Sequence, residues 1–220
     1  MIIPSAQDLA KYAGKYNMVP ICEEIYADVI TPITLLRKLS SISKNYYLLE
    51  SIEGGSRWGR YSFLGFNPLM HVTCKNHTVT IKSGSITNTE TGDSMDILRR
   101  LHAQYKSPHI DGMPPFTGGF VGYFSYEMIG YAEPKLNLKG SDFNDFDLML
   151  FDKVIAYDHL KQKINIVVNT NPDDGIQGYN AAVLEIKKII ELINDTTPLP
   201  KAYAEENVDF KCNLTKEQYC

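Results

Sequence analysis

Helical hydrophobic patterns occur at four places along the chain. Thr31 followed by Pro32 predicts a helix with Thr31 as N-cap and Pro32 at the first helical position, where the missing N–H costs nothing. Gln177–Asn194 carries the longest apolar stripe, with hydrophobic residues recurring at three- and four-residue spacing. Two shorter helices are predicted after Ser5 and over Ser94–Tyr105.

Short apolar runs bounded by turn residues predict strands through the middle of the chain. Tyr46–Leu49 is continuously apolar, which is typical of a strand covered on both faces. Gly118–Phe124 and Leu148–Tyr157 are interpreted as central strands, while Thr78–Ile81 and Ser85–Thr89 flank a short turn and predict a hairpin. Further strands are predicted over Val19–Ile25, Tyr61–Leu64, Leu69–Cys74 and Ile164–Val168.

These elements predict an α+β fold of mainly antiparallel β-sheets packed with helices, because turns join successive strands and helices are fewer than strands. With 220 residues, the chain can form one large domain or two small ones. We expect residues 1–194 to form one domain and Asp195–Phe210 to be an exposed connection. Thr215-Lys-Glu-Gln218 is a capping box, which starts a helix, yet only two residues follow it. We therefore expect residues 195–220 to be a linker and the start of a further part of a longer protein.

Composition and charge narrow the functional classes. Hydrophobic residues make up 44% of the chain, which is ordinary for a globular protein. The formal net charge of −4 indicates that the chain lacks the basic surface that binding to nucleic acid or to an anionic membrane would need. Residues 1–5 show no secretory leader, and no apolar run approaches the roughly 18 residues of a membrane span. Four scattered cysteines indicate reduced thiols. We expect a cytoplasmic protein with no nucleic-acid or membrane partner.

The best candidate for chemistry lies directly after the predicted strand Tyr46–Leu49. Glu50 and Ser51 follow this strand and lead into a loop with two glycines and the only tryptophan, Trp58. An ionised Glu50 accepts hydrogen bonds, and the Ser51 hydroxyl both donates and accepts. Together they could hold the ammonium group of an amino acid through charge-assisted hydrogen bonds. The alternative is a solvated Glu50 beside a Ser51 that caps a turn, and chemistry alone favours this alternative.

An ordered set of motifs resembles the N-terminal part of the anthranilate synthase component I family. The resemblance runs from about Pro32 to Cys220. Its motifs are Leu48-Leu-Glu-Ser51, Trp58-Gly-Arg-Tyr-Ser-Phe63, the glycine-aromatic strand Gly118–Glu127, the following strand Asp147–His159, and Thr215-Lys-Glu-Gln-Tyr219, which is similar to the helix that opens the catalytic half.

The resemblance implies a division of labour between two halves. In this family the first half binds the feedback inhibitor tryptophan, and the second half binds chorismate with Mg²⁺. Residues 1–194 are then the regulatory domain. Ser51, with Glu50 beside it, would contact tryptophan, and Pro32 would help to wall the pocket. The family's catalytic and metal-binding residues are expected outside this chain, so we expect no turnover from this fragment alone.

The whole enzyme, by the same resemblance, converts chorismate and ammonia into anthranilate and pyruvate in the first step of tryptophan biosynthesis. A glutamine amidotransferase subunit, component II, would deliver the ammonia. Two alternatives stay open. One is 4-amino-4-deoxychorismate synthase component I of the folate pathway, although the loop Glu53–Phe63 favours the anthranilate branch. The other is a free-standing amino-acid-binding module, which an immediate stop codon after Cys220 would favour over a continuing open reading frame.

Overall fold

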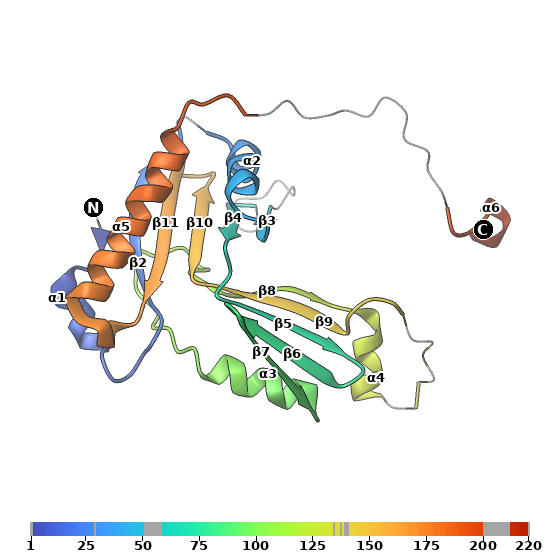
Figure 1. The fold of residues 1–220 in the computed structure, drawn as a ribbon. Helices are drawn as coiled ribbons and strands as arrows, with labels where there is room; N and C mark the ends of the chain where they lie inside the picture. Colours follow the sequence, from blue (N-terminus) through green and yellow to red (C-terminus); the bar gives the residue numbers. More distant parts are fainter. Residues whose placement is uncertain are drawn as a thin grey trace.

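Two antiparallel β-sheets form the framework of the molecule, which confirms the α+β prediction (Figure 1). The computed structural model describes residues 2–28, 30–50, 59–133, 135–136, 138, 141–199 and 212–219. Among these residues the large sheet has six strands, in the spatial order β1 (Ile2–Ile3), β2 (Val19–Tyr26), β11 (Lys163–Thr170), β10 (Lys153–Asp158), β4 (Tyr61–Phe66) and β3 (Tyr46–Leu49). The described small sheet has five, in the order β7 (Ile86–Thr91), β6 (Thr78–Ser83), β5 (Met70–Lys75), β9 (Phe146–Phe151) and β8 (Gly119–Phe124).

The described α-helices are α1 (Ala6–Leu9), α2 (Pro32–Ile42), α3 (Ser94–Ala103), α4 (Ile129–Ala132), α5 (Gly175–Asn194) and α6 (Lys216–Tyr219), with 3₁₀ turns η1 (Ala10–Tyr12), η2 (Tyr126–Met128) and η3 (Pro172–Asp174). Side-chain caps mark the start of α1, α2 and α3, whereas α4 and α5 begin without one. The Thr31 hydroxyl accepts a hydrogen bond from the Thr34 N–H at 3.2 Å, which confirms the predicted cap of α2. Within the described residues, no helix has the length and apolar character to cross a membrane.

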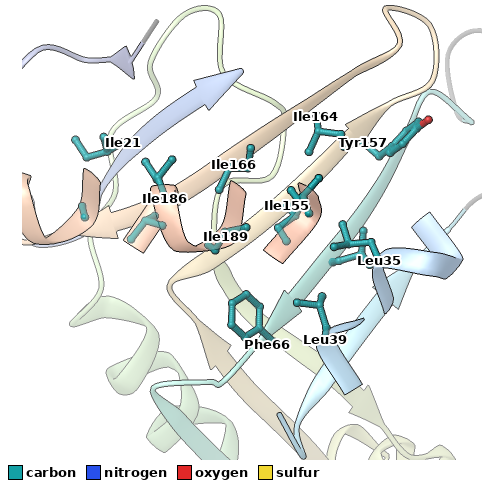
Figure 2. Close-up of a cluster of buried hydrophobic side chains, with 14 of the residues drawn as sticks. Ile21, Leu35, Leu39, Phe66, Ile155, Tyr157, Ile164, Ile166, Ile186 and Ile189 are labelled. Atoms are coloured by element: carbon teal, nitrogen blue, oxygen red, sulfur yellow. The ribbon is translucent and has the colours of Figure 1, made fainter. Parts of the chain in front are cut away.

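The main hydrophobic core lies on one face of the large sheet, under α2 and α5 (Figure 2). Leu35 and Leu39 of α2 are fully buried, as are Ile186 of α5 and the strand residues Ile155 and Ile166. A smaller cluster of Cys22, Val154 and Val167 lies on the opposite face. The central strands are therefore apolar on both faces.

The small sheet has its own core beneath α3. Ile97 and Leu101 of this helix pack with Val72, Val79 and Phe146 from three strands.

The segment that follows α5 was predicted to be an exposed connection. Its first residues, Asp195–Pro198, are exposed, which confirms this part of the prediction. The remainder of that predicted connection, from residue 200 to 210, lies outside the described residues.

Three strand predictions are wrong in their placement. Tyr46–Leu49 was expected to be covered on both faces, but β3 is the last strand of the large sheet and 48% of Leu49 is exposed. Gly118–Phe124 was expected to be central, but β8 is an outer strand of the small sheet. Leu148–Tyr157 is split at Asp152 between β9 and β10, which belong to different sheets. Apolar residues lie on both sides of Asp152 and Lys153, so the segment resembles one strand interrupted by two charged residues.

Candidate functional site

The predicted site residues Pro32 and Glu50 lie at the same end of a helix–strand pair. Residues 43–45 join α2 to β3, and the chain reverses there. Figure 2 shows the direction of α2, with Leu39 close to Phe66 and Leu35 on the side of Tyr157. The 11-residue helix is about 16 Å long and the four-residue strand about 13 Å, so the first residue of α2 and the residue after β3 lie near the same edge.

The strand register places Glu50 opposite Ser62. Leu48 pairs with Leu64 and Leu49 with Phe63, so the next pair joins Glu50 and Ser62. Alternate residues of a strand share one face, which puts these two polar side chains on the same face as Leu64, beneath α2. The Ser62 hydroxyl lies 3.4 Å from Glu50 Oε1. Ser62 is completely buried, whereas Glu50 is exposed.

A histidine from the neighbouring strand completes this group of side chains. His159 directly follows β10, and its backbone N–H donates a hydrogen bond to the backbone carbonyl oxygen of Arg60 at 2.9 Å. Its Nε2 lies 2.7 Å from Ser62 Oγ. The imidazole also packs against the Tyr157 ring, with 4.7 Å between ring centroids. Glu50, Ser62 and His159, which we call the strand-end relay, therefore form one connected chain across the ends of β3, β4 and β10.

An ion pair fixes the strands that carry the relay. Arg60 Nη2 donates to Asp158 Oδ2 at 2.6 Å, and Arg60 Nε donates to Oδ1 at 3.1 Å. Asp158 is 1% exposed, and its Oδ1 also accepts the N–H groups of Leu160 and Lys161, each at 3.0 Å. Burial raises the pKa of the Asp158 carboxyl, but the hydrogen bonds from Arg60 and Lys161 outweigh it and hold that pKa below its ordinary value. Asp158 therefore stays ionised and paired.

The structure answers only part of the site prediction. Pro32 is the first residue of α2 and is buried, and Glu50 stands at the open strand end. Ser51 belongs to residues 51–58, which lie outside the described residues, so its role stays a prediction. Sequence reasoning missed Ser62 and His159. Both fall inside motifs quoted for the family resemblance, but no spacing in the sequence indicates that they meet.

The chemistry of the relay suits a cationic group rather than a metal ion. An exposed carboxylate with a buried hydroxyl behind it offers acceptors to an ammonium group. The Arg60 guanidinium is paired with Asp158 in a bidentate geometry. In the part of the chain that the structure describes, no three His, Cys, Asp or Glu side chains are grouped so as to hold a metal ion. These residues therefore do not fit a Mg²⁺ site.

Comparison with known proteins identifies the family. A family model described as chorismate binding enzyme matches residues 44–220. The chain belongs to the chorismate-binding enzyme family. The matched segment contains the whole strand-end relay. The matched segment begins at residue 44, in the connection between α2 and β3, so Pro32 lies outside the matched segment.

Several relatives of this chain carry the name anthranilate synthase component 1. The protein from Acetivibrio thermocellus is 34% identical over 100% of this chain and 47% of its own length. That from Pseudomonas aeruginosa is 32% identical over 94% of this chain and 44% of its own length. The crystal structure of anthranilate synthase component I from Streptococcus pneumoniae TIGR4 has a TM-score of 0.53 at 23% identity, covering 80% of this chain and 38% of that one, and supports the fold. The chain spans less than half the length of these relatives and corresponds to their N-terminal portion.

Proposed function

We propose that this chorismate-binding family member is the N-terminal, tryptophan-binding regulatory portion of an anthranilate synthase component I. Residues 1–194 would form the regulatory domain and residues 195–220 a linker to the next part. The observation that carries the proposal is the position of Glu50. This exposed carboxylate is the last residue of the described Leu48–Glu50 part of the family-like signature, and the buried Ser62 hydroxyl lies within hydrogen-bond distance of it.

Each predicted site residue has a distinct part in tryptophan binding. The Glu50 carboxylate accepts hydrogen bonds from the ligand's ammonium group, and the Ser51 hydroxyl provides a second polar contact. Pro32 at the start of α2 supplies an apolar wall. Tryptophan bound at this edge favours an arrangement of the whole enzyme that is unfit for chorismate. A coupling free energy of about 1–3 kcal/mol is enough for strong feedback inhibition.

The reaction itself belongs to the complete enzyme in this proposal. It converts chorismate and ammonia into anthranilate, pyruvate and water, with the ammonia supplied by the glutamine amidotransferase component II. Mg²⁺ would polarise the bound substrate, and its ligands would come from the portion of the relatives that this chain does not span. We expect the 220-residue chain to have no turnover by itself.

Calorimetry with L-tryptophan tests the ligand assignment. The protein encoded by the complete reading frame is titrated as wild type, Ser51→Ala and Glu50→Gln, with the exposed Glu191→Gln on α5 as a matched control. We expect Ser51→Ala and Glu50→Gln to weaken binding about tenfold or more, since each removes a contact to the charged ammonium group. Unaltered affinity in both variants would show that the pocket has been placed wrongly.

Product analysis separates the proposed branch from its alternatives. Incubation of the same protein with chorismate, ammonia and Mg²⁺ should give anthranilate. Formation of 4-amino-4-deoxychorismate instead would favour the folate-pathway synthase. Tryptophan binding without turnover of chorismate would favour a free-standing amino-acid-binding module.

A further inference from the structure

Ser62 has one hydroxyl proton and two neighbouring acceptors. Its Oγ lies 2.7 Å from His159 Nε2 and 3.4 Å from Glu50 Oε1, and the side chain is completely buried. A hydroxyl donates one hydrogen bond at a time. When His159 Nε2 carries no proton, it accepts the Ser62 proton at the shorter distance. When Nε2 carries a proton, it donates to Ser62 Oγ, and the Ser62 proton is free to point at Glu50.

We propose that His159 is a positioning residue for the ligand-binding carboxylate of Glu50 and acts through Ser62. This inference rests on the proposed function, because it assumes that Glu50 receives the ammonium group of tryptophan. A protonated Nε2 turns the hydroxyl of Ser62 toward Glu50 and holds the carboxylate at the strand end. A bare Nε2 takes the Ser62 proton and releases Glu50 from this hydrogen bond. The amino-group subsite is therefore set by a proton on a neighbouring strand.

The surroundings of His159 limit what else acts on it. Glu50 faces the imidazole through Ser62 from the end of β3, and the Tyr157 ring packs against it from β10. Arg60, directly before β4, contributes a carbonyl acceptor to the backbone N–H of His159, and its guanidinium charge is compensated by Asp158.

Two substitutions at position 159 separate hydrogen-bond donation from simple packing. Glutamine places an amide N–H near the position of Nε2 and does not titrate, whereas leucine fills space without donating. We expect His159→Leu to weaken tryptophan binding about tenfold, measured by calorimetry on the protein encoded by the complete reading frame. His159→Gln should stay within about threefold of wild type, which a loss of packing alone would not allow, and a tenfold loss in this variant as well would overturn the relay. Exposed His109→Leu and His109→Gln are the matched controls and should change nothing.

A double-mutant cycle tests the route through Ser62. Ser62→Ala should weaken binding about as much as His159→Leu, and the double variant should lose little more, because both break the same chain. Additive losses, or wild-type affinity in His159→Leu, would overturn the relay while leaving the tryptophan site intact. If wild type binds no tryptophan, the proposed function and the relay both fail. Thermal unfolding of each variant identifies any that do not fold, and the retained or lost affinity of His159→Gln then decides the result.

Discussion

A buried aspartate lies at one end of a strand in each sheet, Asp158 as the last residue of β10 and Asp145 directly before β9, and the two carboxylates accept hydrogen bonds in different ways. Asp158 in the large sheet uses both oxygens, with Arg60 on each of them and two backbone N–H groups on Oδ1. Asp145 in the small sheet, 6% exposed, gathers its donors on Oδ2, from the Tyr131 hydroxyl at 2.6 Å and the Asn76 N–H at 2.7 Å. One is an ion pair, and the other is a carboxylate held by neutral groups.

We propose from this difference that the ligand binds at the end of the molecule where Glu50 lies. Asp145 connects the β5–β6 turn to Tyr131 in α4, and its hydrogen bonds hold structure together. At the other end, the Arg60–Asp158 pair rigidifies the strands while Glu50 beside them remains exposed. A closed carboxylate has a structural role, and an open carboxylate on a rigid support is suited to a ligand. The following experiments compare these carboxylates, from the largest expected effect to the smallest.

Asp158→Asn should have the largest effect on stability. The variant replaces the Asp158 carboxylate with a neutral amide, so the half-buried Arg60 guanidinium loses its negatively charged partner. Removing one member of a buried pair is strongly destabilising, and with Arg60 partly solvated we expect a loss of about 2–3 kcal/mol in the free energy of unfolding. Urea denaturation of the chain measures it. A loss no greater than that of Asp145→Asn would contradict the contrast drawn between the two sheets.

Lowering the pH should remove the stability that the Arg60–Asp158 ion pair contributes to the wild-type protein. The pKa of Asp158 in the folded state lies below its ordinary value of 3.8. Its contribution to stability is therefore fully present above pH 3.8 and is lost as the pH falls through the lower, folded-state value. Between about pH 5 and pH 2, wild type should lose more unfolding free energy than Asp158→Asn, which has no carboxyl at this position to titrate. Parallel losses in the two proteins would mean that this carboxyl is not the one responsible.

Local parts of the fold could be predicted from the sequence because their signals are local. The Thr31 cap and Pro32 fix the start of α2 within four residues, and Thr215 and Gln218 form the predicted reciprocal capping box at 2.9 and 3.3 Å. The position of β3 at the sheet edge and the break at Asp152 were not predicted. These depend on which distant strands pair, and an apolar run has the same appearance in either case.

The candidate site likewise has residues that were predicted from the sequence and residues that only the structure brings together. Glu50 and Pro32 were predicted as site residues from the family resemblance, because the chemistry of the sequence alone favours a solvated Glu50 and marks Pro32 only as the start of a helix. Ser62 and His159 are 97 positions apart and meet only through the register of β4 with β10. No periodicity within either strand encodes that register, so the relay could be recognised only in three dimensions.

Asp145→Asn should cost less than Asp158→Asn. An asparagine that directs its single oxygen toward Tyr131 and Asn76 keeps both hydrogen bonds, because both use the same carboxylate oxygen. We expect a loss of less than about 1 kcal/mol, measured by urea denaturation. Tyr131→Phe, which removes one donor, provides a second measurement at the same place. A loss above that of Asp158→Asn would mean that the negative charge itself is needed in the small sheet.

Glu50→Gln should have the smallest effect on stability. Glu50 is exposed, and its amide analogue can still accept the hydrogen bond from Ser62, so we expect the unfolding free energy to stay within about 0.5 kcal/mol of wild type. The same substitution is expected to weaken tryptophan binding. A residue that matters for the ligand and not for the fold is what distinguishes the open carboxylate from the two closed ones. If Glu50→Gln destabilised the chain as much as Asp145→Asn, Glu50 would be part of the framework, and the ligand would have to be sought elsewhere.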